Sequence, residues 1–327
     1  KFPYYLSRNE QAMVHAAVGY AKLRNRLSAY ACLSSIGPGA TNMVTGAASA
    51  TINRVPVLLM AGDMFAERVQ SPVLQQLEWP GSQDTSVNDA FRPVVRYWDR
   101  INRPEQVITV APEVMRILTS PVETGAVFLA LPQDIQTYDF DFPSEMFEKR
   151  VWAIPRNRPD SGSLRAAVDW IRKAKRPVIL AGHGVLLADA TAELLAFADK
   201  ASIPVAWTLL GIGVIDETHP LAYGYVGMHG WKHVNKAVQS ADLLVAVGMR
   251  FDDRVTGNVR TFAPYARIVH ADIDPAEIGK NVSVEVPIVG DAKRVLAGLL
   301  ELAEPVAPDA RADYLAELAA WRADSEG

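Results

Sequence analysis

The chain has 327 residues, of which 49% are hydrophobic and 21% are charged, and its formal net charge is −4. This composition is that of a globular protein of two domains, and the lack of a basic run argues against a nucleic-acid partner. The single cysteine, Cys32, excludes a disulfide framework and indicates the reducing cytoplasm, and no apolar stretch reaches the ~20 residues of a membrane span.

Helical and strand-like segments alternate along the first half of the chain. Residues 7–22 have one apolar face at helical spacing, with Ser7 or Asn9 as the N-cap and Glu10 in the first turn. Apolar runs at 28–35, 55–63 and 125–134 indicate buried strands, and residues 36–53 and 104–120 indicate helices. This alternation predicts βαβ units around a parallel sheet.

A polar, proline-bearing stretch without period separates this half from a second one, and it is typical of an interdomain connection. Helices are then expected at 163–175, 190–201 and within 286–303, and strands at 176–184, 203–211, 241–250 and 266–274. We predict a first domain at 1–140, a linker at 141–163, a second domain at 164–305 and a helical segment at 306–327.

Two groups of glycines lie at expected strand ends. The first is Gly37 and Gly39 in SSIGPGATN, between a strand and a helix, where ligands bind in open α/β sheets, although a structural tight turn explains it equally well. The second group lies at nearly every strand end in the second half. At this edge of a sheet a dinucleotide would bind, and the arginines of the group could bind its phosphates. Taken singly, its glycines make turns and its acidic residues cap helices; its members are Gly182, Gly184, Gly211, Gly213, Gly227, Gly230, Arg250, Asp252, Asp253, Arg254, Asp272, Asp274, Gly290 and Asp291.

These residues resemble the thiamine-diphosphate-dependent acetohydroxyacid (acetolactate) synthase family. The likeness covers nearly the whole chain and rests on NEQAMVHAAVGYA, SSIGPGATNMVTG, VGMHG, VGMRFDDRVTG and VHADIDPAEIGKN. It implies two doubly wound parallel-sheet α/β domains, an N-truncated pyrimidine-binding domain and a Rossmann-like middle domain. Because the family's GDG run is missing, we expect a diphosphate-binding domain, with its Mg²⁺, to be absent from this chain, which alone should be inactive.

The resemblance assigns the catalytic role to Glu10. In the family, the matching carboxyl group hydrogen-bonds the aminopyrimidine ring of the cofactor and favours the tautomer that accepts a proton from the thiazolium carbon. Gly37, Pro38, Gly39 and Asn42 match the loop that holds the pyrimidine side. A plain first-turn carboxylate remains the alternative reading of Glu10.

By the same resemblance the middle domain binds FAD, which is chiefly structural in the family. His183 stands where a third glycine is usual, which counts against binding. The positions that match the flavin lining are Gly182, Gly184, Thr208, Leu209, Gly227, Met228, His229, Gly248, Arg250, Asp252, Arg254, Val255, Asp272 and Asp291.

The first half also resembles trihydroxycyclohexanedione hydrolase, a thiamine-diphosphate enzyme of inositol breakdown, in RNEQAMVHAA, SPVLQQLE and NDAFRPVVRYWDRINRPEQ. We expect decarboxylation of pyruvate and its addition to a second 2-oxo acid. The alternatives are hydrolysis of a cyclic 1,2-dione and a non-catalytic nucleotide-binding module. The resemblance implies a homodimer or homotetramer, because Glu10 acts across a subunit interface in the family, and it is compatible with a regulatory subunit. Gln75 and Gln76 are candidates for facing the substrate, but the sequence assigns them no role.

Overall fold

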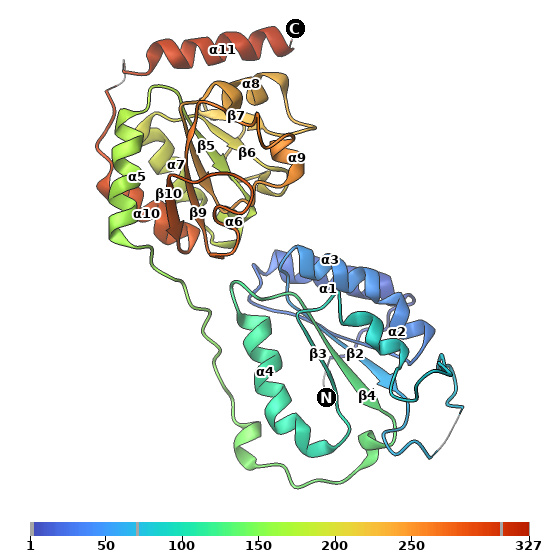
Figure 1. The fold of residues 1–327 in the computed structure, drawn as a ribbon. Coiled ribbons are helices and arrows are strands. Elements are labelled where there is room, and N and C mark those ends of the chain that lie inside the picture. Colours follow the sequence, from blue (N-terminus) through green and yellow to red (C-terminus); the bar gives the residue numbers. More distant parts are fainter. Residues whose placement is uncertain (1–2, 70–71, 308–309, 327) are drawn as a thin grey trace. The chain divides into compact units, whose positions relative to one another are not determined.

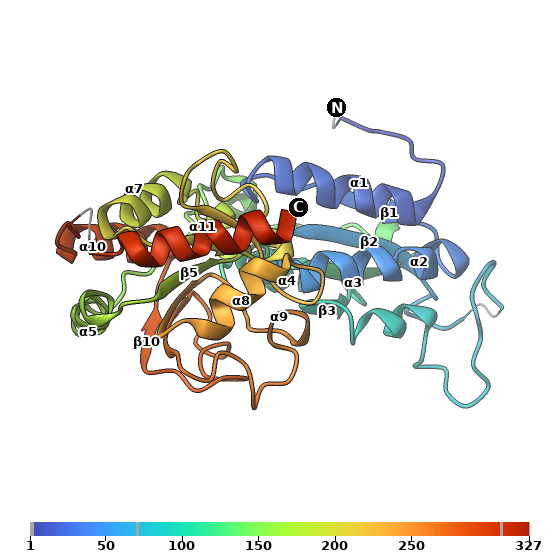
Figure 2. The same cartoon turned by 90° about the horizontal axis from the view of Figure 1, so that it is seen from above.

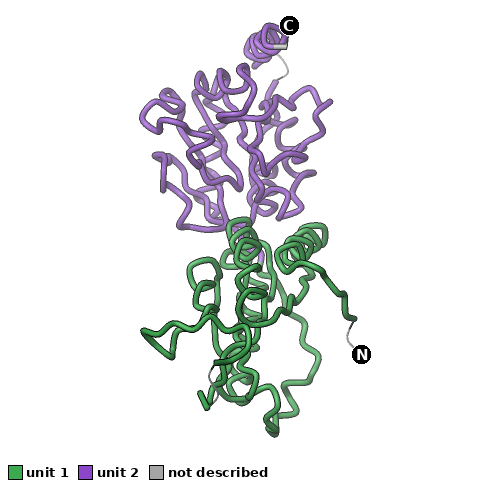
Figure 3. The backbone as a smooth tube through the Cα atoms, turned by 90° about the vertical axis from the view of Figure 1, so that its right-hand side faces the viewer, with its two compact units in different colours: residues 1–155 green, residues 156–327 purple. Residues whose placement is uncertain are grey.

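The computed structural model describes residues 3–69, 72–307 and 310–326 and divides into two compact units, residues 1–155 and 156–327 (Figure 3). Each unit is a parallel sheet with helices on both faces, which confirms the predicted fold class. The outermost residues of the predicted first domain and of the final helical segment, and Ser71 of SPVLQQLE, lie outside the described residues. None of the helices in the described ranges is long and apolar enough to cross a membrane.

The first unit has a four-stranded parallel sheet in the order β1-β2-β4-β3 (Figure 1). Its strands are β1 (Ala31–Ser34), β2 (Val57–Asp63), β3 (Tyr97–Arg100) and β4 (Ala126–Pro132). Its helices are α1 (Glu10–Leu23), α2 (Pro38–Asn42), α3 (Val44–Ile52) and α4 (Val107–Thr119). Short 3₁₀ turns lie at η1 (Val87–Phe91), η2 (Pro104–Gln106), η3 (Ile135–Thr137) and η4 (Ser144–Phe147).

Alternate residues of the central strands face opposite sides of this sheet and form two cores. Leu59 and Phe128 pack with α1 and α3, and the ring of Phe128 stacks on Phe91 at 3.9 Å. Leu58 and Val127 face the other side, where α4 covers them. Both faces of the central strands are therefore buried, and ligands can reach this sheet only at its ends.

The second unit has a six-stranded parallel sheet in the order β10-β9-β8-β5-β6-β7 (Figure 1). Its strands are β5 (Pro177–Ala181), β6 (Val205–Trp207), β7 (Ala222–Tyr225), β8 (Leu243–Val247), β9 (Arg267–Asp272) and β10 (Val286–Val289). Its helices are α5 (Ser161–Lys173), α6 (His183–Leu187), α7 (Thr191–Ala201), α8 (Lys232–Ser240), α9 (Asp253–Thr256), α10 (Ala292–Leu302) and α11 (Ala312–Glu326), with a 3₁₀ turn η5 (Leu209–Gly211).

Helices α5, α7 and α10 cover one face of this sheet, and α8 and α11 cover the other (Figure 2). Tyr314 and Leu318 of α11 are buried in the same core as β5 and β8, and the Tyr223 hydroxyl donates to the Leu318 carbonyl at 3.0 Å. Arg311 precedes α11 and donates to carbonyl oxygens at the C-terminal ends of α5 and α7, where the helix dipole favours a cation. The final helix therefore belongs to the second unit.

Two strands were not predicted. All four residues of β3 are only half-buried and two are charged, so the strand has no apolar run. Strand β7 has four residues and includes Gly224, which weakens any strand pattern. The single helix expected at 36–53 is two helices, α2 and α3, joined at Met43.

Candidate functional site

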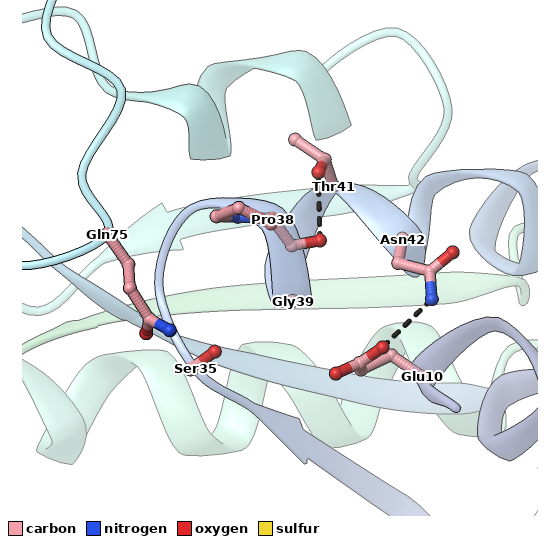
Figure 4. A pocket seen from close by; sticks show the side chains of 7 residues that line it. All are labelled: Glu10, Ser35, Pro38, Gly39, Thr41, Asn42 and Gln75. Atoms are coloured by element: carbon pink, nitrogen blue, oxygen red, sulfur yellow. Dashed lines mark hydrogen bonds between the residues drawn. The ribbon is translucent and has the colours of Figure 1, made fainter. Parts of the chain in front are cut away.

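A pocket of about 600 Å³ opens at the carboxyl end of β1 in the first unit (Figure 4). Three segments line it: the start of α1, the turn between β1 and α2 with α2 itself, and the long loop between β2 and η1. The lining residues are Glu10, Ser35, Pro38, Gly39, Thr41, Asn42 and Gln75. The structure thus brings together Glu10 with three of the four residues that the sequence predicted for the pyrimidine side.

Glu10 presents a carboxylate to this pocket from the first turn of α1, which Asn9 caps through the Ala12 N–H at 2.9 Å. The Asn42 Nδ2 donates to Glu10 Oε2 at 2.8 Å (Figure 4). This bond, and after it a backbone hydrogen bond to Glu10, hold the pKa of Glu10 below its usual value. The second oxygen, Oε1, faces Gly39, where an added Cβ would lie 3.4 Å from it. Glu10 is therefore an oriented carboxylate with one oxygen turned toward the glycine turn.

The fourth predicted residue, Gly37, does not line the pocket but contacts the loop that carries Gln75. It has a φ of +71°, and an added Cβ would lie 1.8 Å from the backbone carbonyl oxygen of Gln75. Pro38 follows at the start of α2, where its fixed φ suits the first helical turn, and its carbonyl accepts the Thr41 hydroxyl at 2.9 Å. The space that Gly37 leaves is filled by the long loop, and this contact brings Gln75 to the pocket.

One arginine fixes both ends of that loop. Arg100 Nε donates to Asp63 Oδ2 at 2.7 Å, and its Nη2 donates to the Ser86 hydroxyl at 3.2 Å. The Asp63 side chain is 0% exposed and that of Arg100 is 15% exposed. This pair was not predicted, because the strand that carries Arg100, β3, has no apolar run that marks it in the sequence.

Three further residues line the pocket: Ser35, Thr41 and Gln75. Ser35 and Thr41 were not predicted, although they lie within SSIGPGATN, so their place beside the glycine turn was available as a signal. Gln75 was a candidate for facing the substrate without an assigned role, and its loop has no regular structure that would place it at the pocket.

In the second unit, the predicted flavin-lining residues gather at the carboxyl edge of the sheet, but three of the glycines pack on one another. An added Cβ on Gly182 would lie 2.2 Å from the Gly248 carbonyl oxygen, and one on Gly184 would lie 2.7 Å from the Gly248 Cα. A Cβ on Gly227 would lie 2.6 Å from the Arg254 carbonyl oxygen. These glycines therefore allow backbone to approach backbone at the strand ends.

The acidic members of the set also have partners within the unit. Asp252 caps α9 through the N–H groups of Arg254 and Val255, at 3.1 and 3.2 Å. Asp291 caps α10 and pairs with Arg156 Nη1 at 2.8 Å. The other members lie at or after the carboxyl ends of the strands: Thr208, Leu209 (61% exposed), Met228 (60% exposed), His229, Arg250 and Asp272, the last residue of β9, whose Oδ1 accepts the Asp274 N–H at 2.9 Å.

A buried histidine supports the loop after β8. His270 is 0% exposed, and its Nε2–H donates to the Met249 carbonyl at 2.8 Å. Its Nδ1 has no hydrogen-bond partner within the described part of the chain. Desolvation lowers the pKa of His270, so the folded protein holds a neutral ring.

We expect His270 to make stability depend on pH below about 6.5. The unfolded chain protonates there while the folded ring stays neutral, so the free energy of unfolding should fall by up to about 1.4 kcal/mol per pH unit as pH drops toward the folded pKa. Urea unfolding of wild type and His270→Gln between pH 7.5 and 5 measures this slope. The variant should show a shallower slope, whereas His15→Gln, at an exposed position, should match wild type; equal slopes in all three proteins would contradict the assignment.

Comparison with known proteins identifies both units. Residues 1–85 match the family model for the thiamine pyrophosphate enzyme N-terminal TPP binding domain, and residues 164–299 match that for the thiamine pyrophosphate enzyme central domain. A 3D-(3,5/4)-trihydroxycyclohexane-1,2-dione hydrolase 1 of Bacillus cereus (strain ZK / E33L) is 42% identical over 98% of this chain and 50% of its own length. The hydrolases of Bacillus anthracis (strain A0248) and Bacillus thuringiensis (strain Al Hakam) are 41% and 42% identical over the same shares. The chain thus spans about half the length of the curated relatives it matches.

These relatives show that the main functional prediction, carboligation of 2-oxo acids, is wrong. Their similarity extends over the second half, where VGMRFDDRVTG and VHADIDPAEIGKN had favoured the synthase. The structure gives the physical reason, because Asp252, Gly248 and Asp272 in these runs shape loops and a helix end and do not define a substrate. With both domain models matched in order, the chain belongs to the thiamine pyrophosphate enzyme family and carries its N-terminal TPP binding domain and its central domain.

Proposed function

We propose that this chain is part of a thiamine-diphosphate enzyme that hydrolyses a trihydroxylated cyclohexane-1,2-dione. The observation that carries the proposal is the 42% identity, over 98% of the chain, to a protein named for that hydrolysis. The pocket supports it, because Glu10 is the one charged side chain among the described residues that line it. The other lining side chains are neutral, and their amide and hydroxyl groups suit an uncharged polyol.

The residues of the pocket fit the pyrimidine half of the cofactor. Thiamine diphosphate, when bound, supplies a thiazolium carbon that attacks a carbonyl and an electron sink for the bond that breaks. Glu10 would accept a hydrogen bond from a protonated nitrogen of the aminopyrimidine ring, and its negative charge would stabilise that proton there. Asn42 orients the carboxylate and keeps it ionised. Gly39 leaves room beside Glu10 Oε1 for a flat ring.

The metal and the assembly are proposed from the family resemblance. No group of three or more His, Cys, Asp or Glu side chains that could hold a metal ion occurs in the described ranges. From the resemblance, we propose that the Mg²⁺ ligands of the whole enzyme lie in its diphosphate-binding domain. We also propose a cytoplasmic homodimer or homotetramer, in which the catalytic carboxylate acts across a subunit interface. The regulatory subunit belongs to the synthase reading and is not proposed.

We do not propose FAD for this chain. Five of the residues predicted to hold it have roles in the packing of the second unit: added Cβ atoms on Gly182, Gly184 and Gly248 would meet the chain's own backbone, and Asp252 and Asp291 cap helices. We assign the set no part in the reaction.

The test uses the full-length protein with thiamine diphosphate and Mg²⁺. Water that cleaves the bond between the adjacent carbonyls opens the ring to a chain with one carboxylic acid and one aldehyde, so base uptake in a pH-stat follows the reaction. We expect hydrolysis of 3D-(3,5/4)-trihydroxycyclohexane-1,2-dione and no acetolactate from pyruvate. Acetolactate formation without hydrolysis of the dione would overturn the proposal.

A further inference from the structure

We propose that Gln75 is a specificity-determining residue, whose side-chain amide hydrogen-bonds a hydroxyl group of the polyhydroxylated ring. The inference rests on the proposed function and adds to it the group that distinguishes a hydroxylated dione from a bare one. Gln75 is the one lining residue contributed by the loop between β2 and η1, whereas the other six come from α1, α2 and the turn before α2.

The side chain of Gln75 is placed to meet a ligand. Figure 4 shows it extending beside Ser35, across the glycine turn from Glu10. Its amide makes no hydrogen bond to any residue that the structure describes, and the residue is exposed. Both the donor and the acceptor of this amide are therefore available to a bound molecule.

The backbone at Gln75 is held in an unfavourable conformation. Its φ is +67°, in the left-handed region, which is unfavourable for a residue with a Cβ. Its carbonyl rests against Gly37, which is also left-handed, with a φ of +71°. Such strain persists only where the surroundings enforce it, and it concentrates at functional sites. Two left-handed residues from distant parts of the sequence thus maintain the contact that brings the amide to the pocket.

The loop that carries Gln75 is fixed at both ends. At its start, the Asp134 carboxylate accepts the N–H groups of Ala66 and Glu67 at 3.0 and 3.1 Å. At its end, Arg100 holds Ser86 and connects it to the buried Asp63. Anchored ends and a packed middle restrict where the amide can go. A restricted neutral amide is suited to selecting a substrate by hydrogen bonding.

The chemistry of the amide predicts the direction of selection. A hydroxyl group both donates and accepts, and the free Gln75 amide and the Ser35 hydroxyl can satisfy both roles. A pocket built to pair a substrate hydroxyl discriminates against an analogue without it, because its own polar groups then lose their partners. The enzyme should therefore prefer a ring with hydroxyl groups over an otherwise identical ring without them, and this preference should depend on Gln75.

The experiment compares two substrates on the full-length holoenzyme, trihydroxycyclohexane-1,2-dione and cyclohexane-1,2-dione. In Gln75→Ala, kcat/KM for the hydroxylated dione should fall by about 10–100-fold, mainly through KM, while that for the bare dione should change less than about 3-fold. If the bare dione is not turned over, its inhibition constant serves the same comparison. Gln83→Ala is the matched control, because Gln83 is an exposed glutamine of the same loop outside the pocket lining, and both values should stay at the wild-type level.

A second variant tests whether the effect of Gln75→Ala comes from the lost amide or from a loop that fails to form. Gln75→Asn keeps the amide and tolerates left-handed backbone, but it is shorter by one methylene, so it should lose most of the same preference. Three results would overturn the inference about Gln75 and leave the proposed function standing. They are an equal loss of kcat/KM on both diones, an unchanged preference for the hydroxylated dione in both Gln75 variants, or a weakened affinity for thiamine diphosphate. If wild type hydrolyses neither dione, the proposed function fails, and the inference fails with it.

Discussion

Replacing Glu10 with Gln is expected to lower kcat of the full-length holoenzyme by about 10²- to 10⁴-fold, the usual contribution of a positioned acid–base group. Glutamine has nearly the same volume and can still accept the Asn42 amide hydrogen, so the pocket should keep its shape. What it cannot supply is the negative charge that stabilises a proton on the ring nitrogen. Steady-state hydrolysis of the dione at saturating thiamine diphosphate measures the loss.

The alternative reading of Glu10, a first-turn carboxylate, makes a different prediction. Such a residue stabilises the helix by about 0.3–1 kcal/mol and leaves kcat alone. Thermal unfolding of the same variant separates the two readings, because the catalytic role predicts a large change in kcat with a small change in Tm. Glu105→Gln provides the control, since Glu105 is an acidic residue in the first turn of η2 and does not line the pocket. Wild-type kcat in Glu10→Gln would remove Glu10 from the mechanism.

Removing Arg100 is expected to destabilise the first unit by about 3–5 kcal/mol, because it leaves the carboxylate of Asp63 buried without its counter-charge. The Asp63 side chain is 0% exposed, so water cannot replace the lost partner. Arg100 also holds Ser86 and the Asp84 carbonyl, at 3.2 and 3.4 Å, so the loop that carries Gln75 should lose its fixed end. Urea unfolding of Arg100→Ala in the 327-residue chain measures the stability.

Two further variants make this result specific to the buried pair. Arg116 has a side chain that is 51% exposed and pairs with Glu113 and Glu123 on the surface, so Arg116→Ala should cost no more than about 1 kcal/mol. Adding Asp63→Asn to Arg100→Ala should restore part of the lost stability, because the neutral amide is easier to bury than an unpaired carboxylate. Equal losses of stability in Arg100→Ala and Arg116→Ala would show that the buried pair with Asp63 contributes no more to folding than a surface pair.

Much of the fold could be predicted because both sheets are buried on both faces. Strands such as β2, β5 and β8 then read as continuous apolar runs, and the helices between them keep one apolar face. Strand β3 escaped prediction because it lies at the edge of its sheet, where Asp99 and Arg100 can remain half-exposed. Its pairing with β4 is a long-range contact that no local pattern encodes.

The site was predictable only as far as local chemistry reached. Glu10 and Asn42 lie next to a helix start and a glycine turn, and their roles were predicted from the resemblance to thiamine-diphosphate enzymes, the family to which the chain belongs. Gln75 reaches the pocket only because Gly37 has no Cβ and so leaves space for the Gln75 carbonyl. This contact joins residues that are far apart in the sequence. The substrate was predicted wrongly because local patterns were given too much weight. The runs that pointed to the synthase build loops and helix caps in the second unit.

The position of α11 at the end of the second unit affects how this unit folds during translation. Tyr314 and Leu318 complete a core that otherwise comes from β5, β8 and α8, and Arg311 binds carbonyls at the ends of two earlier helices. During translation, the six strands of the second sheet leave the ribosome before these residues do. Until α11 follows, the apolar side chains beneath it have no cover, and the nascent second unit is an expected target for chaperones that bind exposed apolar segments.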